Sequence, residues 1–346
     1  MSRPVVKINF VDFGSFQPAI DVFIKSFTSA IETFADIEIS DNPDFLICGC
    51  YGGDHWDYDC VKIYYSTEEH EPDFNVYDYA IGQSVVQMYD RYLYEPQYLS
   101  YRFYENTKKA LEKHKHPDEY FLGKKKFCNF IYSNGHADKF RENTFHALNA
   151  YKHVDSAGKF LNNMGSDQIA GERFKGDWEK SKIEFMKDYR FTIAFGNAQR
   201  YDYADEKIFD AWNAGTIPVF WGDPKLKEKF NTEAYIDCCD CKTAEEVVER
   251  VKEIEEDPEK YLAMQKAPIL KEGSEWYDYI VNNKFRQDFI DFLHHIMTQS
   301  PEDARRTSNG IAMKMYRRDQ KALSRMKNKC IYRVYRKYIL SKFYRR

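Results

Sequence analysis

The stretch "RYDYADEKIFDAWNAGTIPVFWGDP", residues 200–224, decides how this chain folds. It follows the apolar run "YRFTIAFGN" (189–197), whose length and β-branched content predict a buried strand. Next comes a turn in which Asp202 or Asp205 can cap a short helix. Gly215 ends that helix, and "TIPVFWG" begins a second strand. The pattern therefore predicts strand, loop, helix and strand, the repeating unit of an α/β fold.

The first turn of this predicted helix carries Glu206 and Lys207. A lysine is unfavourable there, because the helix dipole already makes the amino end positive. In α/β folds, ligands collect at the carboxyl ends of strands and at the amino ends of the helices that follow. An anion such as a diphosphate would make Lys207 favourable, so we expect a nucleotide diphosphate to bind here.

The composition describes a globular protein with room for two domains. The chain has 346 residues, of which 43% are hydrophobic and 31% charged. We expect no secretory leader and no membrane-spanning helix, because no apolar run approaches about 18 residues. The eight cysteines show no disulfide framework, which suits a reducing compartment. We therefore expect a cytoplasmic protein.

The charge is distributed unevenly along the chain. The net charge is −4, yet residues 305–346 hold fifteen Lys and Arg residues against one acidic residue. Leu323, Met326, Cys330 and Val334 recur at steps of three and four residues, which predicts a basic amphipathic helix. We expect this tail to bind an anionic membrane surface, on the inner face of the membrane. Packing against the acidic body, or binding a polyanion, remains an alternative. That acidic body argues against nucleic-acid binding.

Common cofactor and metal motifs are missing. The sequence has neither GxGxxG nor GxxxxGK[ST]. Cys238 and Cys241 form a lone CxxC, and zinc would need a second pair, so we interpret them as free thiols. The triplet Asp57-Tyr58-Asp59 has metal-site spacing but no metal-site context. We predict no metal.

Both halves of the chain alternate predicted strands and helices, which favours parallel sheets. The lysine-rich segment 113–126 is interpreted as a linker. We therefore predict domains at residues 1–120 and 121–300, followed by the tail at 301–346. The expected strands are at 5–13, 44–52, 61–65, 76–82 and 127–133, and the expected helices at 16–34, 140–151 and, broken at Pro258, 243–265.

Two long motifs resemble the α-1,3-fucosyltransferase family, glycosyltransferase family 10, and its bacterial members above all. Residues 191–224 are similar to that family's donor-binding signature, which runs from Phe-Glu-Asn-Ser through a tyrosine turn and Thr-Glu-Lys to "IPIYWG". The segment "YYSTEEHEPDFNVYDYAIG" (64–82) is similar to its acceptor-side segment. "GKFLNNMG" (158–165) between them also resembles the family. The motifs follow the family's order, and the likeness extends over roughly residues 5–300.

The resemblance implies a GT-B architecture with two Rossmann-like domains, the acceptor side first and the GDP-fucose side second. It implies an inverting transfer of L-fucose from GDP-β-L-fucose to the 3-hydroxyl of N-acetylglucosamine in an N-acetyllactosamine-like glycan, which we expect to be lipid-linked. It implies no resident cofactor, and we expect donor binding to need no divalent cation. Alternatives are another GDP-sugar as donor, or a glycan- or nucleotide-binding homologue without turnover.

Site residues follow from the matching motif positions. The resemblance implies that Glu206 holds the ribose and Lys207 the diphosphate, and that Asn197 and Tyr203 line the donor site. The family also has an earlier basic residue at the phosphates, for which Lys159 is the nearest candidate.

The resemblance makes Glu68 the general base, and its place after a strand agrees, because catalytic groups gather there in α/β folds. Glu69 and Glu71 are close enough in sequence to be rivals. Three departures stand out, since Gly196 replaces the family's donor-site glutamate, Ala198 its serine and Asp205 its threonine. The first leaves the identity of the donor sugar open.

Overall fold

The computed structural model describes residues 3–15, 17–68, 70–165, 168–169, 178–307 and 311–327. The chain divides into two compact units. Unit 1 comprises residues 1–82, 86–94 and 286–346, and unit 2 comprises residues 83–85 and 95–285. The C-terminal part of the chain therefore returns to the unit that the N-terminus began.

Unit 1 is built on a six-stranded sheet in the order β2-β1-β3-β4-β5-β6, and every neighbouring pair is parallel. The strands are β1 (Val5–Val11), β2 (Asp36–Ile39), β3 (Phe45–Cys48), β4 (Val61–Tyr65), β5 (Tyr79–Gly82) and β6 (Tyr92–Tyr94). Its helices are α1 (Gln17–Ile31), most of α11 (Lys284–Met297), α12 (Pro301–Ala304) and α13 (Ile311–Lys327).

The two faces of this first sheet are covered differently. Apolar side chains of α1 and α11 form one core with it, in which the rings of Phe27 and Phe289 lie 5.2 Å apart. The other face packs against loop residues, with Tyr64 against Tyr77 at 4.9 Å. The C-terminal helix α11 is thus a structural part of the N-terminal sheet.

Unit 2 is built on a five-stranded parallel sheet in the order β11-β10-β9-β7-β8. The strands are β7 (Lys126–Phe130), β8 (Val154–Ser156), β9 (Tyr189–Phe195), β10 (Ile217–Trp221) and β11 (Ile236–Asp237). The helices are α2 (Tyr104–Leu111), α3 (Asp118–Leu122), α4 (Lys139–Tyr151), α5 (Trp178–Met186), α6 (Glu206–Asn213), α7 (Leu226–Lys229), α8 (Ala244–Glu255), α9 (Pro258–Lys266) and α10 (Glu275–Val281).

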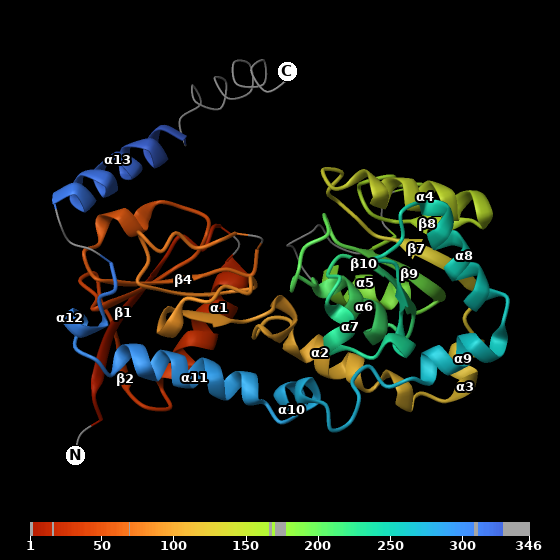
Figure 1. Ribbon diagram of the computed structural model, residues 1–346, viewed down its shortest axis with the longest axis horizontal. Helices are drawn as coiled ribbons and strands as arrows, with labels where there is room; N and C mark the ends of the chain where they lie inside the picture. The colour runs from red at the N-terminus through yellow and green to blue at the C-terminus, as the bar shows by residue number, and fades with distance from the viewer. Residues whose placement is uncertain are drawn as a thin grey trace. The chain divides into compact units, whose positions relative to one another are not determined.

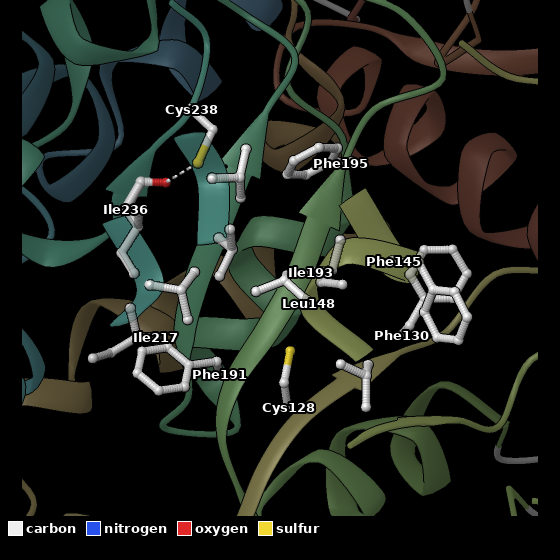
Figure 2. Close-up of a cluster of buried hydrophobic side chains, with 14 of the residues drawn as sticks. Cys128, Phe130, Phe145, Leu148, Phe191, Ile193, Phe195, Ile217, Ile236 and Cys238 are labelled. Carbon is white, nitrogen blue, oxygen red and sulfur yellow. Dashed lines mark hydrogen bonds between the residues drawn. The ribbon is translucent and has the colours of Figure 1, made fainter. Parts of the chain in front are cut away.

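Helices cover both faces of this second sheet. On one face, α4 and α8 lie side by side, and Phe145 and Leu148 of α4 join a core with Phe191, Ile193 and Phe195 of β9 (Figures 1 and 2). On the other face, α2, α6 and α10 contribute a separate core. A strand covered on both faces is mostly apolar, and five of the seven residues of β9 are apolar or aromatic, the exceptions being Arg190 and Thr192.

The predicted pair of α/β units with parallel sheets is confirmed, and so is the strand–helix–strand reading of residues 189–221. Asp205 caps α6, since its side chain accepts the Lys207 N–H. Gly215 follows the helix with φ of +66°, a conformation that favours glycine.

The predicted domain limits and linker differ from the structure. Residues 95–120 pack in unit 2, and residues 286–300 return to unit 1. The segment 113–126 is part of the core of unit 2 rather than a linker, because Lys113 is buried and its Nζ donates to the carbonyl oxygens of Met264 (3.1 Å) and Gln265 (2.8 Å). Burial lowers the pKa of Lys113 to about 7. The many lysines of segment 113–126 had indicated a solvent-exposed linker, but packing against distant residues buries Lys113.

The described part of the basic tail is helical and contacts unit 1. Lys321 and Arg325 of α13 pair with Asp57, and Arg317 and Arg305 approach Asp59 to 4.0 and 3.3 Å. The helix therefore follows the alternative in which the tail packs on the acidic body. Leu323 and Met326 of the predicted apolar stripe lie on α13 and are exposed (41% and 47%), whereas Cys330 and Val334 lie outside the described residues. Within the described residues, no helix is long and apolar enough to span a membrane.

Candidate functional site

The carboxyl ends of β7 and β9 form the switch point of the second sheet. From β7 the chain leads through α4 to one neighbour, β8, while β9 leads through α6 to the other side of the sheet. The two helices belong to cores on opposite faces. Loops that diverge in this way leave a crevice between them, where α/β proteins bind nucleotides.

Tyr132 joins the two strand ends at this point. Its hydroxyl accepts the Phe195 N–H (2.7 Å) and lies within hydrogen-bond distance of the Ile193 and Phe195 carbonyl oxygens (3.0 and 2.9 Å). Burial raises the pKa of this phenol, which therefore stays neutral and donates. The bond network holds the loop after β9 in a fixed position beside the end of β7.

Asn197 lies in that loop and is held by a buried arginine. Its carbonyl accepts the Asp138 N–H at 2.7 Å, and its Oδ1 accepts from Arg141 Nη1 at 3.1 Å. Arg141 is only 1% exposed, and its guanidinium lies 4.2 Å from the centre of the Tyr132 ring. Arg141 was not predicted, because a charged residue inside a helix usually faces solvent.

The amino end of α6 carries the predicted pair. Lys207 Nζ lies 2.6 Å from Asp205 Oδ2 and 3.5 Å from Glu206 Oε1, and 5.8 Å from the Tyr132 ring centre. The Glu206 N–H donates to Gln97 Oε1 at 3.2 Å. Burial disfavours the charged ammonium, but attraction to the two carboxylates outweighs it, so the pKa of Lys207 is raised. A permanent cation thus lies at the switch point.

A second ion pair supports this helix from α5. Lys182 Nζ lies 2.5 Å from Asp210 Oδ2, and both side chains are buried. Burial raises the pKa of Asp210 to about 6, against the attraction of Lys182. Neither residue was predicted. Their only sequence signal is that Asp210 lies four residues after Glu206, one turn along the same face of the helix.

Tyr203 and Lys159 differ in their surroundings. Tyr203 is 9% exposed and packs in the turn before α6, so little of its side chain is accessible. Lys159 is exposed on a turn that lies directly against Tyr132, whose carbonyl accepts the Phe160 N–H at 2.8 Å. Gly158 is required there, since a Cβ would lie 2.2 Å from the same carbonyl oxygen. Lys159 therefore lies at the same edge of the sheet as Lys207.

Glu68 lies in unit 1, three residues after β4. Its side chain is exposed, and its N–H donates to Ser66 Oγ at 3.0 Å, which fixes the turn. Burial and the nearby charge of Glu68 raise the pKa of Tyr51. Glu71 is also exposed, and Glu69 lies outside the described residues. A partly solvated carboxylate with a neutral phenol donor can accept a proton.

The loop that carries Tyr51 is built around the buried Asp12. This carboxylate accepts the N–H groups of Asp54 (2.9 Å) and His55 (3.1 Å), and lies 2.5 Å from His55 Nδ1. Asp12 itself has φ of +65°, and a Cβ on Gly52 would lie 2.1 Å from its Oδ1. Gly52 and His55 of "CYGGDHW" thus order the loop around Asp12.

No group of three or more His, Cys, Asp or Glu side chains that could hold a metal ion occurs among the described residues. Asp57 and Asp59 of the acidic triplet pair with cations of the C-terminal part instead. Cys238 and Cys241 are free thiols, and Cys238 Sγ contacts the Ile236 carbonyl at 3.7 Å (Figure 2).

Comparisons with known proteins give a consistent family. Residues 8–101 match the model of the alpha-(1,3)-fucosyltransferase FucT N-terminal domain, and residues 121–266 match the C-terminal model of glycosyltransferase family 10 (fucosyltransferase). Together the two matches cover more than half of the chain.

Individual relatives point to the same family. Alpha-(1,3)-fucosyltransferase FucT of Helicobacter pylori is 31% identical over 231 residues, which are 59% of this chain and 46% of that protein. Putative fucosyltransferase R654 of Acanthamoeba polyphaga mimivirus is 26% identical over 44% of this chain and 25% of its own length. The chain thus spans about half the length, or less, of these curated relatives. A solved structure of an α1,3-fucosyltransferase with GDP-fucose has the same fold, with a TM-score of 0.69 and 23% identity over 86% of this chain and 92% of that chain.

Proposed function

The chain belongs to the fucosyltransferases of glycosyltransferase family 10, and on that premise we propose that it transfers L-fucose from GDP-β-L-fucose to a glycan hydroxyl. The finer proposal is transfer to the 3-hydroxyl of N-acetylglucosamine in an N-acetyllactosamine-like glycan, with inversion at the sugar. Its main support is Lys207, a permanent cation in the first turn of α6. This helix begins at the switch point of the second sheet.

The donor half of the reaction uses the residues at this switch point. Glu206 holds the ribose, and Lys207 and Lys159 contact the diphosphate, both from the same edge of the sheet. Asn197, which Arg141 holds in place, borders the sugar. The Tyr203 side chain is buried and packs beneath the turn before α6, which it supports. A fixed ammonium stabilises the negative charge that grows on the leaving GDP.

The acceptor half uses Glu68 as general base. As the bond from the sugar C1 to the diphosphate oxygen breaks, the electron pair leaves with GDP. The acceptor oxygen forms its bond to C1 from the opposite face, and its proton passes to the Glu68 carboxylate. The neutral Tyr51 phenol lies near that carboxylate and can donate a hydrogen bond to it. All atoms and charges balance without a metal or further cofactor.

The tail and location form a further part of the proposal. Residues 305–346 bind an anionic membrane surface through their basic side chains, so that the enzyme acts on lipid-linked glycans at the cytoplasmic face. The strong positive charge of this segment supports binding to anionic lipid.

One observation favours a second candidate within the same class. Gly196 stands where the family has a glutamate, so the pocket lacks one carboxylate that could meet the sugar. Another GDP-sugar is therefore the alternative donor.

The test is release of GDP from GDP-fucose by purified protein, with and without N-acetyllactosamine. Release that depends on the acceptor supports the donor and the transfer together. No release while GDP binds would exclude this donor–acceptor pair and favour the alternative sugar. Glu68→Ala should then abolish transfer and leave GDP affinity unchanged, while Glu71→Ala serves as the matched control. Equal losses in both variants would contradict the role of Glu68.

A further inference from the structure

Lys207 is held by the residue that caps its own helix. One oxygen of the Asp205 carboxylate accepts the Lys207 N–H at 3.1 Å, and the other lies 2.6 Å from Lys207 Nζ. Capping requires only one acceptor oxygen, which asparagine or threonine supplies as well. The charge of Asp205 is therefore not needed for the helix, and its effect falls on Lys207.

Two carboxylates neighbour the charged Lys207 ammonium. Asp205 and Glu206 both lie within 3.5 Å of its ammonium, while Lys182 is already paired with Asp210. Asp205 is 6% exposed, so water screens its charge weakly. Burial raises the pKa of Asp205 and Lys207 opposes that rise, which keeps the two charges together as a pair.

We propose that Asp205 is a positioning residue that competes with the diphosphate of the donor for Lys207, and thereby weakens nucleotide binding and favours release of GDP. This inference rests on the proposed function, because it requires a diphosphate at Lys207. A phosphate that approaches the ammonium must share it with the Asp205 carboxylate and is repelled by that carboxylate. The arrangement therefore places the lysine correctly in the empty enzyme and limits how strongly it retains the product.

The experiment compares Asp205→Asn and Asp205→Thr with the unaltered protein. Both variants keep an acceptor for the Lys207 N–H and remove the charge. GDP should bind about tenfold more tightly to each, because one repulsion between partly buried charges is lost. The KM for GDP-fucose should fall in parallel, and the melting temperature should remain nearly unchanged.

Asp257→Asn is the matched control. Asp257 caps α9 in the same way and accepts the N–H groups of Glu259 and Lys260, but it belongs to another helix. Its variant should leave GDP affinity unchanged. Tighter GDP binding there too would show a general charge effect and overturn the proposal.

Two further outcomes separate this inference from the proposed function. If the unaltered protein binds GDP but both Asp205 variants bind it equally or more weakly, the competition is wrong and the function stands. If the unaltered protein and both variants fail to bind GDP, both the inference and the proposed function are wrong.

Discussion

Replacing Arg141 with methionine tests how the switch point is held together. Methionine keeps the apolar stem but removes the guanidinium, which donates to Asn197 Oδ1 and to the Asn134 carbonyl. It also removes the contact with the Tyr132 ring. Asn197 is half-buried and Asn134 exposed, so the loss falls mainly on the loop that carries Asn197.

The magnitude follows from these contacts. Each hydrogen bond from a charged donor contributes about 1.5–3 kcal/mol, and the ring contact about 0.5–2 kcal/mol. The guanidinium, however, is almost completely buried, which lowers the pKa of Arg141 and shows that its desolvation offsets part of this gain. We therefore expect Arg141→Met to lower the unfolding free energy of unit 2 by about 3 kcal/mol.

Urea unfolding followed by tryptophan fluorescence measures this effect in the right part of the chain. Four of the five tryptophans, at positions 178, 212, 221 and 276, belong to unit 2. GDP affinity should fall together with stability, because the loop after β9 loses its anchor. Arg102→Met is the control, since Arg102 pairs with Glu179 at 2.6 Å in a partly exposed position. A loss below about 1 kcal/mol for Arg141→Met, or an equal loss for Arg102→Met, would refute the reasoning.

Three other predictions concern single positions. Gly196→Glu should raise kcat/KM for GDP-fucose if the missing carboxylate decides the donor. A new Cβ would lie 3.3 Å from the Ala198 carbonyl oxygen and 3.7 Å from Gly222 Cα and the Trp221 carbonyl oxygen, and an unchanged preference among GDP-sugars would contradict the idea. Lys113 has a folded-state pKa of about 7, below its unfolded value of about 10.4, so the folded protein binds fewer protons than the unfolded chain. The free energy of unfolding should therefore rise between pH 7 and 10, by an amount on the order of 3 kcal/mol. Lys113→Met should remove this rise in urea midpoints, and a rise that persists in the variant would exclude Lys113 as its source. Asp57→Asn should free Lys321 and Arg325 for lipid and strengthen sedimentation with phosphatidylglycerol vesicles up to about tenfold, whereas unchanged sedimentation would argue against competition between Asp57 and lipid.

Local patterns in the sequence predicted the elements that surround the candidate site. The apolar run of β9, the cap at Asp205 and the glycine at position 215 each specify backbone conformation within a few residues. The same holds for the turn that carries Glu68 after β4. Such features depend on sequence neighbours, and the motifs that contain them indicated the fucosyltransferase family.

Contacts between distant segments could not be predicted in this way. The burial of Lys113 depends on carbonyl groups about 150 residues away, and Arg141 meets Asn197 56 residues later. The pairing of Lys207 with Asp205, the cap of its own helix, is local, yet it was not predicted. The resemblance assigned Lys207 to the diphosphate, and Asp205 was interpreted only as a cap. Polarity alone does not reveal which charged side chains find buried partners.

The return of the chain to unit 1 after residue 285 has a consequence for biosynthesis. Phe289, Leu293 and Ile296 of α11 complete the core under the N-terminal sheet, and each contributes roughly 2 kcal/mol when buried. While the ribosome is still making unit 2, the six strands of unit 1 and α1 are already outside the exit tunnel, and the part of the apolar face that α11 covers is still exposed. The N-terminal half therefore matures last, although it is made first, and a fragment that ends at residue 120 would emerge as an aggregation-prone sheet rather than an independent domain.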